Sequence, residues 1–197
     1  MKKDIAKNYS PSEVEDKIYE RWLNNGYFTP KIDKNKEPFT MQPVIRPFRA
    51  ADAPAVSELI AKTLRLSNVQ DYSQEYIDAC VAQFTADGVL QRASWTHFYV
   101  ACKDESIVGC GAVGPYWGSE TECSLFNIFV LPACQGIGIG RQIVHALEQD
   151  PYALRSCRIE VPASRTAQGF YEAMGYTSKP GVPQPDPEQL FRMEKYR

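Results

Sequence analysis

A run of alternating glycines between a predicted strand and a predicted helix constrains this chain more than any other feature. The apolar stretch 125–131 leads into the run Gln135-Gly136-Ile137-Gly138-Ile139-Gly140-Arg141, and an amphipathic helix follows. Glycines take positive φ freely and carry no Cβ, so several backbone N–H groups can converge on one anion. The unpaired N–H groups and the dipole of the following helix favour the same ligand, and Arg141 adds a cation. The run therefore predicts a binding site for a phosphorylated cofactor.

The spacing of the glycines excludes two common phosphate-binding signatures. A dinucleotide fingerprint, G-x-G-x-x-G, that begins at Gly136 would require a third glycine where Arg141 stands. The P-loop pattern G-x-x-x-x-G-K-[ST] is absent from the sequence, which argues against an NTPase. The run does fit Q/R-x-x-G-x-G/A from Gln135 to Gly140, and so resembles the acetyl-CoA pyrophosphate loop of the GNAT superfamily of N-acetyltransferases.

A second segment resembles the other signature of this superfamily, A-x-x-F-Y-x-x-x-G-F/Y. It lies at residues 164–176, and its apolar residues recur at helical spacing on one face: Ala167, Phe170, Tyr171 and Met174. The resemblance implies that Tyr171 lies beside the cofactor sulfur and protonates the departing thiolate. A phenol suits this role because it holds its proton at neutral pH. The alternative, an aromatic side chain that only packs on a helix face, stays open.

The resemblance also implies the fold class, α/β (α+β) with the GNAT acyl-CoA N-acyltransferase fold. We expect a central mixed, mostly antiparallel sheet of about six or seven strands, splayed between strands four and five and flanked by about four helices. The hydrophobic pattern predicts strands over residues 44–48, 95–102, 106–113, 122–131, 156–161 and 189–196. It predicts helices after a cap at Asp52, over residues 73–84, after the glycine run and around Tyr171.

Acetyl-CoA is the co-substrate that the resemblance implies. Its pyrophosphate would contact the amides of residues 135–141, and its pantetheine arm would add to the sheet along Phe129 and Val130, where strands four and five part. An amide near Phe129 would donate to the oxyanion, which is typically worth ~3 kcal/mol. The predicted cofactor-binding residues are Phe129, Val130, Gln135, Gly136, Ile137, Gly138, Ile139, Gly140, Arg141 and Phe170.

The reaction also needs a base that takes a proton from the attacking ammonium group. Many members of the superfamily use a carboxylate on the fourth strand, and Glu122 is the acid within that strand here. Strand alternation places Glu122 on the same face as Ser124, Phe126 and Ile128. Glu122 is therefore predicted to be catalytic together with Tyr171. Two alternatives stay open, a solvated carboxylate at the strand edge and a water chain that does the work of the base.

The acceptor is less constrained than the cofactor. Tyr116 and Trp117 precede the fourth strand, and Asp186 and Glu188 lie in a proline-rich stretch near the C-terminus. Aromatic rings and carboxylates both attract ammonium groups, so these residues are candidates for a pocket that takes a small cationic amine. An antibiotic, a polyamine, an amino acid and a protein N-terminus all remain open as acceptors.

Composition agrees with a soluble enzyme. The chain has 197 residues, 44% of them hydrophobic, and a net charge of -2, which suits one sizeable core and gives no electrostatic reason to expect nucleic acid or membrane as a partner. No apolar stretch has the length of a membrane span, and the N-terminus is charged, so we expect a cytoplasmic protein. The six cysteines stand singly and the two histidines lie far apart, so we expect free thiols and no metal.

The first 42 residues have a resemblance of their own. Residues 7–22, and then 26–41, resemble the extreme N-terminus of valyl-tRNA synthetases, but the H-x-G-H nucleotide signature of that family is absent. Ser10-Pro11-Ser12-Glu13 is a capping box, and Val14, Ile18 and Trp22 form the apolar stripe of a predicted helix. We therefore divide the chain into an N-terminal helical appendage, residues 1–42, and an acetyltransferase domain, residues 43–197.

The sequence as a whole predicts an acetyl-CoA-dependent N-acetyltransferase that acts by direct attack in a ternary complex. Its partner would be a small-molecule or peptide amine, and a homodimer is left open. Two other classes are carried beside it, a non-catalytic acyl-CoA sensor and a translation-linked adaptor that uses the N-terminal segment. That segment mixes lysines with acidic residues, so it shows no basic face for nucleic acid.

Overall fold

A computed structural model describes residues 11–25, 43–182 and 185–197 of the chain. The chain divides into two units, Met1–Phe39 and Thr40–Arg197, which we describe separately. In the first unit the structure describes helix α1 (Pro11–Asn24), where the sequence predicts a helix. Its exposed face carries the large side chains Ile18, Tyr19, Trp22 and Leu23. Ser10 of the expected capping box, the side chain of Val14 and the predicted domain boundary at residue 42 lie outside the described part.

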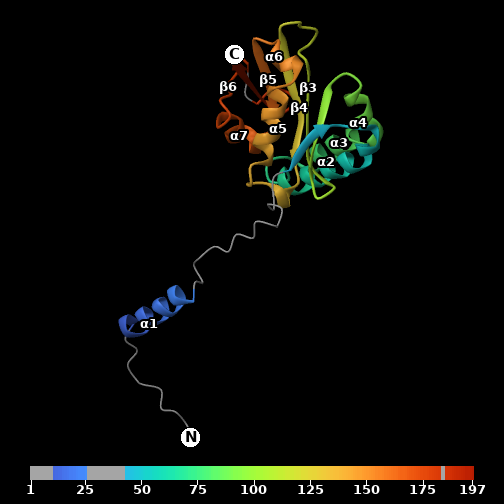
Figure 1. The fold of residues 1–197 in the computed structure, drawn as a ribbon. Coiled ribbons are helices and arrows are strands. Elements are labelled where there is room, and N and C mark those ends of the chain that lie inside the picture. Colours follow the sequence, from blue (N-terminus) through green and yellow to red (C-terminus); the bar gives the residue numbers. More distant parts are fainter. Residues whose placement is uncertain (1–10, 26–42, 183–184) are drawn as a thin grey trace. The chain divides into compact units, whose positions relative to one another are not determined.

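The second unit is built on a seven-stranded sheet with the strand order β1-β2-β3-β4-β5-β7-β6 (Figure 1). Its strands are β1 (Val44–Pro47), β2 (His97–Lys103), β3 (Ser106–Pro115), β4 (Glu122–Val130), β5 (Arg158–Ala163), β6 (Thr177–Ser178) and β7 (Phe191–Tyr196). The β4–β5 pair is parallel and every other neighbouring pair is antiparallel. The predicted mixed, mostly antiparallel sheet is confirmed.

Strands β4 and β5 pair along only part of their length. Their register runs from Glu122 opposite Arg158 to Ser124 opposite Glu160, whereas β4 continues to Val130. The predicted splay between the fourth and fifth strands is therefore confirmed. Backbone N–H and C=O groups need partners, so an edge that a neighbouring strand has left can accept a ligand instead.

A β-bulge lies in β4 beside this separation. In the register with β3, Ala112 lies opposite Phe126 and Cys110 lies opposite Phe129, so β4 contains one residue more than β3 over this interval. Asn127 takes up the extra residue with φ 53°, in the left-handed region that asparagine tolerates better than most residues.

The bulge resets which side chains of β4 share a face. Phe126 and Phe129 both pack against the core cluster on one side of the sheet, whereas Ile128 packs against the cluster on the other side. The expectation that Glu122, Ser124, Phe126 and Ile128 lie on one face is therefore wrong for Ile128. Simple alternation has a period of two, and one inserted residue shifts every later side chain to the opposite face.

Helices cover both faces of the sheet (Figure 1). Helices α2 (Ala53–Ser67), α3 (Gln74–Gln83) and α4 (Ala86–Ala93) form a core with one face, and α5 (Ile139–Glu148), α6 (Pro151–Leu154) and α7 (Gln168–Glu172) form a core with the other. The sequence predicted about four flanking helices and missed α4 and α6, which are short. Both helices have N-cap residues of a type that can be recognised in the sequence: Thr85 and Asp150 accept hydrogen bonds from the N–H groups of Gly88 and Tyr152.

Asp52 precedes α2 as expected, but its side chain does not cap that helix. Its carboxylate accepts two hydrogen bonds from the Arg46 guanidinium, at 2.7 and 2.9 Å, and one from the N–H of Arg49 at 2.8 Å. The Arg46 hydrogen bonds hold the pKa of Asp52 below its usual value. Asp52 therefore ties the start of α2 to β1. In the described part of the chain, no helix is long and apolar enough to cross a membrane.

Candidate functional site

A cavity of about 690 Å³ lies where β4 and β5 separate. It passes through the sheet, because its lining comes from both core clusters: Phe170 and Tyr171 from the α5 face, and Ile77 and Phe126 from the α2 face. Of the predicted site residues, the lining contains Phe129, Val130, Gln135, Gly136, Gly138, Gly140, Arg141, Phe170 and Tyr171. The structure therefore brings the glycine loop, the end of β4 and α7 together around one space.

The glycine loop, residues 135–141, has the backbone conformation that its sequence favours. Gly136 has φ 77° and Gly138 has φ 90°, values in the left-handed region that is costly for residues with a Cβ. Gly138 is the N-cap of α5, so the first N–H groups of this ten-residue helix have no partner within it. Ile137 is exposed and Ile139 is buried in the core, and neither of these two predicted residues lines the cavity.

Side-chain contacts hold the loop against its surroundings. The Gln135 amide donates through Nε2 to the carbonyl oxygen of Val130 at 2.9 Å and to Ser67 Oγ at 3.2 Å. These bonds tie the loop to the end of β4 and to α2. At Gly140 an added Cβ would lie 3.3 Å from the ring of Phe170, so the helix start packs closely against α7.

Tyr171 lines the cavity and is 4% exposed. Its ring packs edge-on against Phe170 and Tyr176, with centroids 5.0 and 5.8 Å away. No described residue bonds to its hydroxyl, and no side-chain polar atom in the described part is both sealed from solvent and unpaired. The hydroxyl is therefore accessible from the cavity. Burial raises the pKa of Tyr171 well above its ordinary value, so the phenol keeps its proton at neutral pH.

Glu122 lies outside the cavity lining. Its carboxylate accepts two hydrogen bonds from Arg158, from Nε at 3.0 Å and from Nη2 at 2.8 Å. These bonds hold the pKa of Glu122 below its usual value and occupy both of its oxygens. A base must lie within reach of the substrate, and a carboxylate with a lowered pKa takes up a proton less readily. The geometry gives no support to Glu122 as the base and suits a structural ion pair.

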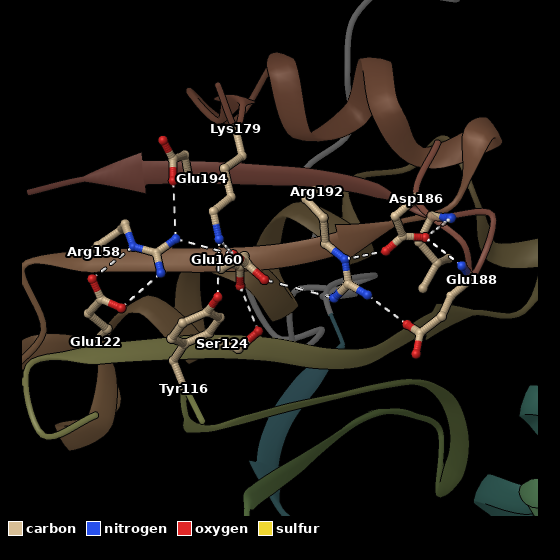
Figure 2. A network of polar contacts seen from close by, with 11 residues as sticks. Tyr116, Glu122, Ser124, Arg158, Glu160, Lys179, Asp186, Glu188, Arg192 and Glu194 are labelled. Atoms are coloured by element: carbon tan, nitrogen blue, oxygen red, sulfur yellow. Dashed lines mark hydrogen bonds and ion pairs between the residues drawn. The ribbon is translucent and has the colours of Figure 1, made fainter. Parts of the chain in front are cut away.

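Arg158 and Glu122 belong to a larger set of paired charges, which we name the β5 charge network (Figure 2). Its members are Tyr116, Glu122, Arg158, Glu160, Lys179, Asp186, Glu188, Arg192 and Glu194. Arg158 Nη1 bonds to Glu160 at 3.2 Å and to Glu194 at 3.1 Å, and Lys179 Nζ bonds to Glu160 at 2.7 Å. The Glu160 side chain is 2% exposed, and its pairing with Arg158 and Lys179 offsets the free-energy cost of burying its charge.

Arg192 links this network to the segment between β6 and β7. Its Nε donates to Asp186 at 2.5 Å and its Nη2 to Glu188 at 2.6 Å, while Nη1 lies 3.8 Å from Glu160. Asp186 also accepts hydrogen bonds from the N–H groups of Glu188 and Leu190. Burial alone would raise the pKa of Asp186, but these N–H groups and Arg192 outweigh it and lower the pKa.

The aromatic and acidic residues expected to form an acceptor pocket do not line the cavity. Trp117 is 87% exposed in the turn before β4, and the ring of Tyr116 lies under the Arg158 guanidinium at 4.6 Å. Asp186 and Glu188 are held by Arg192. Sequence reasoning instead missed the residues of α3 that do line it, among them Tyr76 and Cys80, because the periodicity of α3 marks them as core without indicating a cavity.

The thiols and histidines of the described residues show no metal cluster. All six cysteines are free, and no group of three His, Cys, Asp or Glu side chains in this part of the chain could hold an ion. His97 lies instead against the buried carboxylate of Asp150, with Nδ1 at 2.8 Å from Oδ2.

Residues 94–178 match the family model of the acetyltransferase (GNAT) domain. This range contains β4, the glycine loop, β5 and Tyr171. The chain therefore contains a GNAT acetyltransferase domain, as the two sequence signatures imply.

Solved structures with the same fold cover most of the chain. A PaiA N-acetyltransferase from Thermoplasma acidophilum, in complex with coenzyme A, has a TM-score of 0.68 at 17% identity and covers 80% of this chain and 100% of its own. A GCN5-related N-acetyltransferase from Rhodopseudomonas palustris has a TM-score of 0.66 at 20% identity, covering 82% and 100%. YncA, a putative acetyltransferase from Salmonella typhimurium with its cofactor acetyl-CoA, has a TM-score of 0.56 at 16% identity, covering 78% and 93%.

The short N-terminal segment matches a different group of proteins. It is 55% identical over 38 residues to the valine–tRNA ligase of Clostridium acetobutylicum and 46% identical over 39 residues to that of Clostridium perfringens. The chain spans only about 4% of the length of these curated relatives, and the match takes up about 19% of the chain. The resemblance that the sequence suggested is confirmed for this segment.

Replacing Glu122 tests its structural role. Glu122→Gln removes a charge from a pair with a buried arginine, so we expect the free energy of unfolding at pH 7 to fall by about 1 kcal/mol and Tm by roughly 2–4 °C. A carboxylate whose pKa is lowered by folding stabilises the protein above its unfolded pKa, and this contribution is lost as pH falls. The Tm difference between wild type and variant should therefore shrink below about pH 4.

The control is Glu120→Gln, which changes an exposed carboxylate just before β4 and should leave Tm unchanged. A fall in kcat of about 100-fold or more in Glu122→Gln, without a change in Tm, would contradict the structural role and restore Glu122 as the base.

Proposed function

We propose that this chain, which contains a GNAT acetyltransferase domain, is an N-acetyltransferase that moves the acetyl group of acetyl-CoA to a primary amine in a ternary complex. The observation that carries the proposal is the cavity between β4 and β5, which joins the glycine loop to the accessible hydroxyl of Tyr171. The relatives from Thermoplasma acidophilum and Salmonella typhimurium, which hold coenzyme A and acetyl-CoA, support the choice of co-substrate.

The glycine loop suits the pyrophosphate of this co-substrate. The backbone N–H of Gln135 already donates to the carbonyl oxygen of Pro132, so the loop offers the N–H groups of residues 136–141 at the start of α5, and Arg141 lines the cavity beside them. The pantetheine arm has amide groups, and the edge of β4 at Phe129 and Val130 lacks a strand partner on the β5 side. An extended ligand with amides can pair with such an edge as another strand would.

In the proposed reaction the neutral amine nitrogen attacks the thioester carbonyl carbon. The C–N bond forms, the C–S bond breaks, and Tyr171 gives its proton to the departing sulfur. The nitrogen then releases a proton to solvent, and the Tyr171 phenolate takes up a proton from solvent. A backbone N–H near Phe129 donates to the oxyanion and is typically worth ~3 kcal/mol in the transition state.

The proposal extends to location and assembly. We propose a cytoplasmic protein, which six free thiols suit, and a homodimer stays a prediction.

The second candidate, an adaptor that uses the segment shared with valine–tRNA ligases, rests on that sequence match. Deleting residues 1–42 separates the two, because an enzyme of the kind proposed keeps acetyl-CoA binding without the segment.

Thermal unfolding with and without acetyl-CoA tests the co-substrate. At a hundredfold excess over Kd, binding should add about 2.7 kcal/mol, which corresponds to a rise in Tm of roughly 5–10 °C. Arg141→Glu should abolish most of this rise, because it places an anion beside the pyrophosphate. Arg155→Glu, the same charge change beyond the opposite end of α5, should keep the rise. The same Tm with and without acetyl-CoA, in the folded wild type, would overturn the proposal.

Replacing Tyr171 tests the general acid. Tyr171→Phe keeps the ring contacts with Phe170 and Tyr176 and removes a hydroxyl that no described residue bonds, so Tm should stay within about 2 °C of wild type. We expect kcat to fall about 10²–10⁴-fold with little change in the Kd of acetyl-CoA. Because its pKa is raised, Tyr171 should not cause a fall in wild-type kcat up to about pH 10. Undiminished kcat in Tyr171→Phe would exclude it as the acid.

A further inference from the structure

The side of the cavity that faces α3 is built from aromatic and other weakly polar side chains. We name it the α3 side, and its residues are Tyr72, Tyr76, Cys80, Phe84, Phe126 and Leu190. Apart from Leu190, its residues pack on the opposite face of the sheet from Tyr171 and the start of α5. In the proposed reaction acetyl-CoA enters from the glycine loop, so the α3 side is left for the acceptor.

The two tyrosines of the α3 side use their hydroxyls within the protein. Tyr72 donates to the carbonyl oxygen of Gln189 at 3.1 Å and accepts from the N–H of Arg165 at 3.0 Å. Tyr76 donates to the carbonyl oxygen of Glu188 at 2.9 Å, and the two rings stack with centroids 4.9 Å apart. What these residues offer a ligand is therefore mainly ring surface.

No carboxylate of the described residues lines the cavity, and acidic groups around the α3 side have protein partners, since the Asp71 carboxylate accepts a hydrogen bond from the Thr166 hydroxyl. Arg192 holds Asp186 and Glu188 (Figure 2). The same segment carries the carbonyl oxygens of Glu188 and Gln189 that the two tyrosines bond. Burial raises the pKa of the Cys80 thiol, so it is neutral at pH 7. Among the described residues that line the cavity, Arg141 at the glycine loop carries the charge. The α3 side thus provides a neutral, largely apolar surface of aromatic rings.

We propose that the acceptor is a weakly basic primary amine attached to a large apolar, preferably aromatic, body that carries no free carboxylate. The inference rests on the proposed function and adds the substrate class. Aromatic rings and a thiol stabilise an apolar body by its removal from water, whereas a polycation or a zwitterion would lose hydration without gaining a partner there.

The neutral α3 side also indicates that the acceptor amine is weakly basic. The amine must lose its proton before it attacks, and no carboxylate of the described residues lines the cavity. At pH 7.5 roughly a third of an α-amine is neutral, compared with about 0.1% of a lysine-type amine. An α-amine or a similarly weak base therefore enters this cavity in its reactive form far more often.

Steady-state kinetics with four matched acceptors test the proposal in the full chain. L-phenylalaninamide has both an α-amine and an aromatic body, L-alaninamide lacks the ring, L-phenylalanine adds a carboxylate, and spermidine is a polycation. Release of the CoA thiol and the acetylated amine are both measured at saturating acetyl-CoA and pH 7.5. We expect kcat/KM for L-phenylalaninamide to exceed that of each other acceptor by about tenfold or more, as burial of one large apolar side chain implies.

The outcomes separate this inference from the function that it rests on. Faster transfer to spermidine or to L-phenylalanine would overturn the acceptor class and leave the acetyltransferase in place. No transfer to any of the four acceptors, in a protein that acetyl-CoA stabilises, would overturn the acceptor class as well. No stabilisation by acetyl-CoA would overturn the proposed function itself.

A variant that places a carboxylate on the α3 side gives an independent test. Cys80→Asp should lower kcat/KM for L-phenylalaninamide at least about tenfold and shift the ratio of rates toward spermidine. Cys157→Asp makes the same substitution at an exposed cysteine at the start of β5, away from the cavity, and should keep the wild-type ratio. The acetyl-CoA shift in Tm reports that each variant is folded, and an unchanged ratio in folded Cys80→Asp would contradict the proposal.

Discussion

The separation of β4 from β5 is the constraint on which the rest of this domain depends. The two strands pair over three residues, from Glu122 to Ser124, and then part. Beyond this point the cavity takes the place of the missing strand contacts, and the bulge at Asn127 reorients the side chains of β4 around it. The glycine loop follows β4 after a short 3-10 turn, Pro132–Cys134, and both line the cavity, so the proposed anion site and the unpaired strand edge face one space.

The β5 charge network fixes the strands where they still pair. Arg158 lies opposite Glu122 in the first β4–β5 pair and joins Glu122 of β4 to Glu194 of β7. The Ser124 hydroxyl donates to the carbonyl oxygen of Glu160 at 3.1 Å at the last pair. A buried ion pair adds little net stability but is costly to break, so the network specifies where the sheet stays closed. Through Arg192 the same network holds Asp186, whose segment contributes Leu190 to the α3 side.

The sequence indicated the parts of the site that depend on local chemistry. The glycines of residues 136–140 and the helix after them act through backbone conformation, which neighbouring residues determine, and the structure places them as expected. The bulge at Asn127 depends on the register with β3, and the ion pair of Glu122 joins residues that are 36 positions apart. Neither leaves a local pattern, so both were missed. The periodicity of α3 indicated that its aromatic face is buried. That this face lines a cavity depends on the tertiary arrangement, which the periodicity does not show.

A crystal structure of the chain with coenzyme A bound would test the central claim most directly. We expect the pyrophosphate on the amides of residues 136–141, the pantetheine arm along Phe129 and Val130 between β4 and β5, and the sulfur within hydrogen-bond reach of the Tyr171 hydroxyl. Coenzyme A at another surface, with β4 and β5 unoccupied between them, would contradict it.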